Sequence, residues 1–302
     1  MNFEKILFVV IENNVSELAL SEAVSLAKKL EADFNILCVL PEFGKKHQDL
    51  EDAYREKISQ TIFEILEKMD ISGQTATDHI QFTSGKPYTK TVVDHLQQNR
   101  YDLVIKLSED VNKKGKSGYG SLDISLIRKS PTPVFFINHE VGHTDKRQIF
   151  VAIDPVTSVQ QVEELNKTLL KTADNMASYY GDTIIEVLSC WRFEHETFMR
   201  DSVFSGQSEE EIDALVEDER KAHEDALNAL LDSVQLDNAH QVHIFKGRAD
   251  EVIPNFMKDH DDDLLLMGTI GRVGLSGFFL GNTAENIFNA LDSSLLTIKP
   301  SE

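Results

Sequence analysis

The stretch Asp102-Leu-Val-Ile-Lys-Leu107 aligns with Asp263-Leu-Leu-Leu-Met-Gly268, a shift of 161 residues along the chain. The same shift continues without a gap and brings Gly120-Ser121 onto Gly281-Asn282. It also holds at the end of each copy, where Pro133-Val-Phe-Phe-Ile137 aligns with Ser294-Leu-Leu-Thr-Ile298. A single offset across a strand, a long loop, a helix and a final strand indicates that the chain contains two copies of one domain.

The front ends of the copies match more loosely. Ile6-Leu-Phe-Val-Val-Ile-Glu12 corresponds to Gln148-Ile-Phe-Val-Ala-Ile-Asp154, a shift of only 142 residues. The second copy therefore carries extra residues, which we place around Trp191 to Gln207. A short polar junction, Asn138 to Asp145, separates the copies. We set the domains at residues 1–143 and 144–302, a usual size for single domains.

Short apolar runs alternate with longer stretches of helical period in both copies, which is the pattern of βαβ units. In the first copy the predicted strands are Lys5–Ile11, Phe34–Leu40, His79–Thr83, Leu103–Leu107 and Val134–Ile137. The predicted helices are Ser16–Leu30, Asp49–Met69, Pro87–Gln98 and Leu122–Lys129. The second copy repeats this order from Ile149 to Ile298. The sequence thus predicts an α/β fold made of two tandem, doubly wound, five-stranded parallel-sheet domains, each Rossmann-like.

Charge and composition narrow the possible partners. The net charge is −21, and residues 144–302 hold 13 Lys and Arg against 30 Asp and Glu. A field of this sign repels phosphate backbones, so direct binding of nucleic acid is not expected. The run Ile6–Ile11 is too short for a membrane span or a signal peptide. Cys38 and Cys190 match no metal or redox pattern. We expect a cytoplasmic protein with reduced, buried cysteines.

The sharpest motif is Gly268-Thr-Ile-Gly271 followed, after nine residues, by Gly281-Asn282-Thr283. Glycines allow a loop to leave a strand with its amides turned inward, and the third glycine opens a helix whose dipole favours an anion. We therefore expect Gly268, Gly271, Gly281, Asn282 and Thr283 to hold phosphate.

This motif resembles the phosphate-holding signature of nucleotide-binding universal stress proteins. The match extends over the whole chain, and the tandem arrangement resembles the E-type branch of that family. The resemblance implies an adenine nucleotide alpha-hydrolase-like fold with ATP or another adenine nucleotide as ligand. It also implies that Asp154 contacts the nucleoside, that Val187 packs against the adenine, and that Gly247 belongs to the turn after the third strand of the second copy.

The first copy departs from this pattern. It has Leu107 and Asp110 where the first two glycines stand, and Glu12 in place of Asp154. We expect its phosphate site to be lost, so that replacing Gly120 leaves ligand binding unchanged. In the second copy Asn282 stands where ATP-binding members usually carry serine or threonine.

The remaining sequence patterns give weaker indications of function. The Walker-like Gly115-Lys116-Ser117 lacks the preceding glycine, and no catalytic or metal-binding motif is recognised. We interpret His195 and His223 as surface residues, and the acidic helix around residues 209–219 as solvated. Several aromatic side chains either pack locally or line a pocket for an apolar ligand beside the nucleotide site: Trp191, Phe193, Phe198, Phe278 and Phe279.

The resulting hypothesis is a non-enzymatic, cytoplasmic stress-response protein. It binds a nucleotide or another small ligand in the second domain and acts through protein partners that the sequence does not name. The resemblance further implies a role in resistance to DNA-damaging agents. Two alternatives remain open, a slow ATP hydrolase or phosphotransferase and a ligand-free structural adaptor. We expect Val134–Ile137 and Leu295–Ile298 to pair, giving an internal pseudo-dimer that is a monomer or a homodimer.

Overall fold

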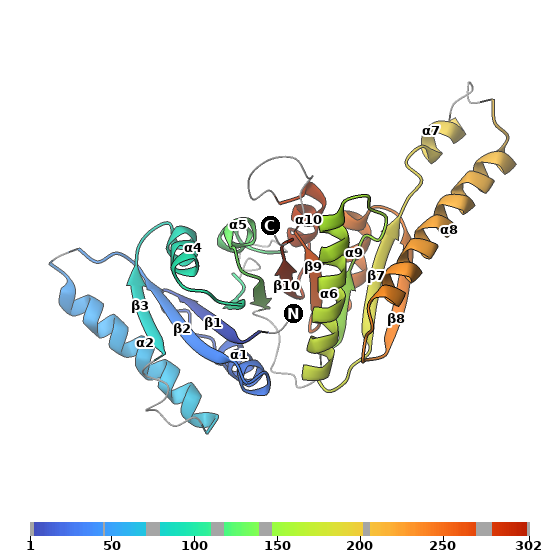
Figure 1. Cartoon of the computed structure of the whole chain (residues 1–302). Coiled ribbons are helices and arrows are strands. Elements are labelled where there is room, and N and C mark those ends of the chain that lie inside the picture. Colours follow the sequence, from blue (N-terminus) through green and yellow to red (C-terminus); the bar gives the residue numbers. More distant parts are fainter. Residues whose placement is uncertain are drawn as a thin grey trace.

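A computed structural model describes residues 3–44, 46–70, 79–109, 118–138, 147–201, 206–269 and 280–300. Figure 1 shows two similar halves side by side. The first half contains strands β1 (Lys5–Ile11), β2 (Asp33–Leu40), β3 (Ile80–Ser84), β4 (Leu103–Leu107) and β5 (Val134–Ile137), with helices α1 (Glu17–Lys29), α2 (Gln48–Lys68), α4 (Tyr88–Gln98) and α5 (Ser121–Lys129). The second contains strands β6 (Ile149–Ala152), β7 (Ile185–Trp191), β8 (His240–Lys246), β9 (Leu264–Gly268) and β10 (Ser294–Ile298), with helices α6 (Gln160–Tyr179), α7 (Glu196–Asp201), α8 (Glu209–Ser233), α9 (Ala249–Met257) and α10 (Asn282–Phe288).

All ten of these strands form one sheet in the order β3-β2-β1-β4-β5-β10-β9-β6-β7-β8. Pairing is parallel within each half and antiparallel where β5 meets β10. At this junction Phe136 lies opposite Leu295, and Val134 lies opposite Thr297. The predicted fold class and the predicted pairing of the two final strands are confirmed. One chain thus contains two copies related by a pseudo-twofold axis.

Helices cover both faces of the sheet, so its central strands are buried on both sides and are apolar almost throughout. Leu20 of α1, Ile62 of α2, Leu169 of α6 and Leu227 of α8 belong to the core on one face. Helices α4, α5, α9 and α10 supply the core on the other. None of the helices described is both long enough and apolar enough to cross a membrane.

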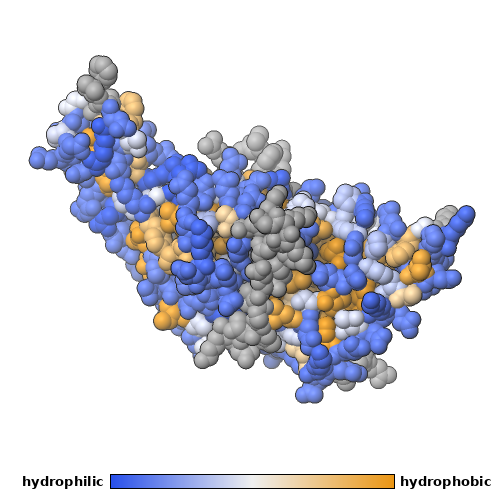
Figure 2. Space-filling model, turned by 180° about the vertical axis from the view of Figure 1, so that it is seen from behind, coloured by the Kyte–Doolittle hydropathy of each residue, from blue (hydrophilic) through white to orange (hydrophobic). Residues whose placement is uncertain are grey.

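An arm formed by α7 and the first turns of α8 projects from the second half (Figure 1). It is largely hydrophilic in the space-filling view (Figure 2). Ser208 begins α8 with a capping box, because its hydroxyl accepts from the Glu211 amide while the Glu211 carboxylate accepts from the Ser208 amide. Such a box satisfies two amides that a helix start otherwise leaves unpaired. The acidic helix predicted from the sequence is confirmed.

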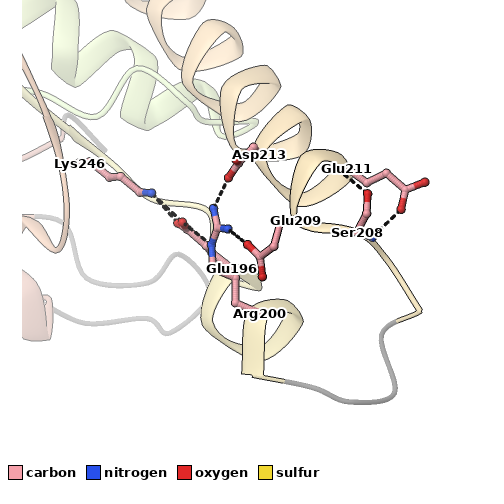
Figure 3. Close-up of polar contacts among 7 residues, drawn as sticks. All are labelled: Glu196, Arg200, Ser208, Glu209, Glu211, Asp213 and Lys246. Carbon is pink, nitrogen blue, oxygen red and sulfur yellow. Dashed lines mark hydrogen bonds and ion pairs between the residues drawn. The ribbon is translucent and has the colours of Figure 1, made fainter.

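Arg200 joins the two helices of the arm (Figure 3). Its guanidinium lies 2.5 Å from Glu209 and 2.6 Å from Asp213, both on α8, and 3.2 Å from Glu196 on its own helix. Glu196 in turn pairs with Lys246 at the end of β8, at 2.6 Å. These groups are partly exposed, so each pair alone is weak, but the shared arginine links α7, α8 and β8 into one network.

Candidate ligand site in the second half

A cavity of about 660 Å³ lies where the carboxyl ends of β6, β7 and β9 meet, between α6, α9 and α10. Ligands in doubly wound sheets bind at this edge. Its polar lining side chains come from Asp154, Thr157, Asn166, Cys190 and Thr283. The remaining lining residues are apolar or glycine. A mostly apolar wall with a few convergent polar groups is typical of small-molecule sites.

Gly268 ends β9 and lines the cavity. A Cβ atom built there would lie 2.6 Å from Cδ2 of Leu165 on α6, so a larger residue would require the Leu165 side chain to shift. The glycine therefore allows α6 to pack closely over the end of β9, in addition to any contact with a ligand. The aligned residue of the first half, Leu107, packs its side chain against the core.

Asp154 follows β6 and is held by its backbone surroundings. Its Oδ1 accepts from the Val156 amide at 3.3 Å, and its carbonyl accepts from Asn166 Nδ2 at 2.7 Å. The residue keeps part of its surface exposed to solvent. The protein atoms packed around the carboxyl displace water from it, and this desolvation raises its pKa. The Val156 hydrogen bond opposes this rise. The side chain is thus an oriented acceptor at the rim of the cavity.

His223 of α8 is buried, with 4% of its surface exposed, so our interpretation of it as a surface residue is wrong. Its Nε2 lies 2.9 Å from Ser189 Oγ, and Ser189 Oγ donates to the Ile153 carbonyl at 3.1 Å. Since the only hydroxyl proton is used on Ile153, the imidazole must donate to Ser189. Burial lowers the pKa of His223, which suits a neutral ring in this role. The pair therefore tethers α8 to the residue before Asp154.

Cys190 lies at the end of β7 and lines the cavity. Burial, and secondarily the Asp154 carboxylate, raises the pKa of its thiol to about 11. Cys38 is fully buried and its thiol pKa is raised by burial to about 12. Both cysteines are free. The expectation that both are buried is correct for Cys38 and wrong for Cys190, which is partly exposed at the end of β7.

The structure brings three of the predicted ligand residues to the cavity, namely Asp154, Gly268 and Thr283. Gly281 is the N-cap of α10 and Asn282 is its exposed first residue; both are next to Thr283 but are not lining residues. Gly271 lies outside the described residues.

The other two predicted residues, Gly247 and Val187, do not line the cavity. Gly247 follows β8 with φ +148°, which favours glycine, and its amide donates to the Trp191 carbonyl at 2.9 Å. Val187 is fully buried in the middle of β7 and belongs to the core on the α6 and α8 face. Cys190, three residues further toward the carboxyl end, reaches the cavity instead.

Sequence reasoning missed the contribution of α6. Val162, Leu165, Asn166 and Leu169 all line the cavity. Their spacing at helical intervals identifies one face of α6, so an apolar stripe was visible in the sequence. The sequence does not show, however, that this face extends over the end of β9 as well as over the centre of the sheet. Its position depends on how the helix packs.

The corresponding edge of the first half differs. Glu12, aligned with Asp154, accepts from the Tyr88 hydroxyl at 2.5 Å. Burial first, and then the bond to Glu12, raises the pKa of Tyr88. The Glu12 carboxylate is thus already hydrogen-bonded to a side chain of the first half. Asp110 and the Walker-like Gly115–Ser117 lie outside the described residues.

The aromatic side chains of the insertion do not line this cavity. Trp191 is buried beneath Lys246, whose Nζ lies 5.6 Å from the ring centroid, whereas Phe198 is 71% exposed. Phe278 and Phe279 lie outside the described residues. Within the described part of the chain, no three His, Cys, Asp or Glu residues gather as a metal site would require.

Comparison with known proteins identifies the family of this chain. The model of the universal stress protein family matches residues 2–138 and 147–299, one match in each half. The chain belongs to the universal stress protein family. It is 27% identical to the Universal stress protein E homolog of Haemophilus influenzae, over the whole of this chain and 99% of that protein. It is 25% identical to Universal stress protein E of Escherichia coli K12, over 70% of this chain and 65% of that protein.

Solved structures of universal stress proteins share the fold. A putative universal stress protein of Pseudomonas aeruginosa superposes with a TM-score of 0.70 at 20% identity, covering 99% of this chain and 94% of that one. A universal stress protein of Archaeoglobus fulgidus gives a TM-score of 0.56 at 14% identity, with 98% of each chain covered. At these identities the likeness establishes the fold alone.

Proposed function

We propose that this universal stress protein is a non-enzymatic, cytoplasmic stress-response protein that binds an adenine nucleotide in the cavity of its second half. The observation that carries the proposal is the convergence of Asp154, Gly268 and Thr283 on one cavity of about 660 Å³. Asp154 supplies an acceptor for the hydroxyl groups of a ribose, and the apolar wall suits a base. The start of α10 beside Thr283 suits a phosphate group. The domain boundary at 143/144 remains part of this proposal.

Isothermal titration calorimetry with ATP tests the proposal. We expect one ATP per chain, bound with an affinity that the acidic charge of the second half keeps modest. Asp154→Asn removes a charged acceptor and should weaken binding by about tenfold, the value of one hydrogen bond to a charged group. The matched control is Glu12→Gln, the equivalent change in the first half, which should leave affinity unchanged. Two ATP molecules per chain, or equal losses from both variants, would contradict the assignment.

Phosphate release from the same ATP samples decides between binding and slow hydrolysis. We expect no release above a buffer blank. Release that Asp154→Asn abolishes would favour the hydrolase or phosphotransferase instead, and absence of any ATP binding would favour the structural adaptor.

The family resemblance extends the proposal to resistance against DNA-damaging agents. Survival of a deletion strain after such exposure tests this role. Complementation with wild type should restore survival, and complementation with Asp154→Asn should restore it only in part if ligand binding is needed.

A further inference from the structure

The start of helix α5 in the first half already holds an anion, supplied by the chain itself. Glu109 Oε2 accepts a hydrogen bond from the backbone amide of Leu122 at 2.8 Å. Leu122 is the second residue of this nine-residue helix. First-turn amides have no acceptor within the helix, and the helix dipole favours negative charge there. The carboxylate therefore makes the contact that a phosphate oxygen would make.

Gly120, the N-cap of α5, leaves room for this carboxylate. A Cβ atom at residue 120 would lie 2.1 Å from Glu109 Oε2 and 2.6 Å from Glu109 Cβ. Its backbone φ of −73° is open to any residue, so space and not conformation requires glycine here. The glycine that the first half shares with the phosphate motif thus accommodates a side chain of the protein.

Two further groups hold Glu109 in place. Its backbone amide donates to Asp123 Oδ2 at 2.6 Å, and Asp123 Oδ1 accepts from Lys106 Nζ at 2.8 Å. The side chains of Lys106 and Asp123 are 6% and 0% exposed. Lys106 also donates to the Leu107 carbonyl at 2.6 Å. The end of β4 is thereby fixed to α5 through a buried ion pair, with the Glu109 carboxylate directed at the helix start.

The second half has no equivalent of this arrangement in its sequence. The gap-free alignment places Met267 at Lys106, Ile270 at Glu109, Thr283 at Leu122 and Ala284 at Asp123. All three ionic residues are replaced by uncharged ones. The two copies therefore differ by more than the loss of glycines from the first.

We propose that Glu109 is an internal ligand, an autoinhibitory carboxylate that occupies the anion position of the first half and closes it to phosphate-bearing molecules. Lys106, Asp123 and Gly120 are the positioning residues of this contact. The proposal does not depend on what the second half binds. It also changes the expected role of Gly120, because a substitution there displaces Glu109 and is not silent for the first half.

Inorganic phosphate is the probe for this proposal, and the amide of Leu122 is the reporter. Two-dimensional NMR of the full chain labelled with 15N-leucine follows that resonance, which Leu122→Ile assigns by its disappearance. In wild type we expect no saturable shift of Leu122 on titration with phosphate at constant ionic strength. In Glu109→Ala the shift should saturate, with phosphate affinity at this amide higher by about tenfold or more, as expected for one charge-assisted hydrogen bond.

Two variants keep the test decisive. Glu64→Ala removes an exposed carboxylate from the middle of α2 and should behave as wild type, which controls for net charge. Glu109→Gln keeps the size of the side chain and serves if Glu109→Ala folds poorly; it should also admit phosphate, because a neutral amide competes less well. A saturable Leu122 shift in wild type, or none in either Glu109 variant, would overturn the proposal. Because the reporter lies in the first half, this result is separable from ATP binding by the second.

Discussion

The Arg147 guanidinium lies 2.7 Å from the Glu22 carboxylate, and both side chains are almost fully buried, at 0% and 2% exposure. Glu22 comes from α1 of the first half, whereas Arg147 precedes β6 of the second. Arg147 also donates to Ser294 Oγ at 2.7 Å, and Tyr180 donates to Glu22. The two halves are therefore joined by a buried polar cluster as well as by the β5 and β10 strands.

Arg147→Leu should strongly destabilise the protein. The change leaves the Glu22 carboxylate buried without its partner, and breaking a buried pair in this way costs about 3–5 kcal/mol. Urea unfolding followed by circular dichroism measures the loss. The control is Lys68→Ala, which breaks an exposed pair with Glu17 and should cost no more than about 1 kcal/mol. Equal effects of the two variants would show that the cluster does not stabilise the junction.

Cys190 should react slowly with iodoacetamide at neutral pH. With a thiol pKa of about 11, its thiolate is scarcer than that of an ordinary cysteine by about a hundredfold or more. Asp154→Asn removes a nearby negative charge and should speed the reaction. Mass spectrometry of the Cys190 peptide gives the rate, and the Cys38 peptide is the internal control because it is remote from Asp154. An unchanged Cys190 rate in Asp154→Asn would contradict the described proximity.

Stability should fall as the pH is lowered from 7 toward 5, in part through His223. Its pKa is lowered in the folded protein, so the unfolded chain binds the proton more readily. The stability that neutral His223 contributes is fully present above its pKa in the unfolded chain, about 6.5. It is lost as the pH falls through the pKa of His223 in the folded protein. The free energy of unfolding of His223→Gln should therefore fall less steeply with decreasing pH than that of wild type. The difference in slope should be at most about 1.4 kcal/mol per pH unit. If the stability of wild type and of His223→Gln falls equally with pH, His223 is not buried in its neutral form.

The sequence predicted most of the fold because its apolar runs begin directly after polar residues or proline. Strands β1, β4 and β5 begin and end where expected, since Lys5, Leu103 and Val134 follow polar residues or proline. Asp154 was predicted from the family resemblance and Thr283 from the glycine motif, and both line the cavity. The duplication also predicted how the two halves join, because a duplicated domain can pair its own final strands.

Other features depended on packing that no local pattern reveals. His223 lies four and seven residues before Leu227 and Leu230, so its position on the buried stripe of α8 was readable, but its partner Ser189 was not. Glu109 resembles any loop carboxylate in sequence. Only the three-dimensional approach of the β4 end to α5 shows that it fills the helix start.

The central claim is that the second half binds a nucleotide while the first half is closed. Photoaffinity labelling with 8-azido-ATP, followed by peptide mapping, tests it most directly. We predict labelled peptides only from the second half, around residues 149–201 and 249–300, with labelling that unmodified ATP suppresses. Labelling confined to the first half, equal labelling of both halves, or no labelling that ATP suppresses would contradict the account.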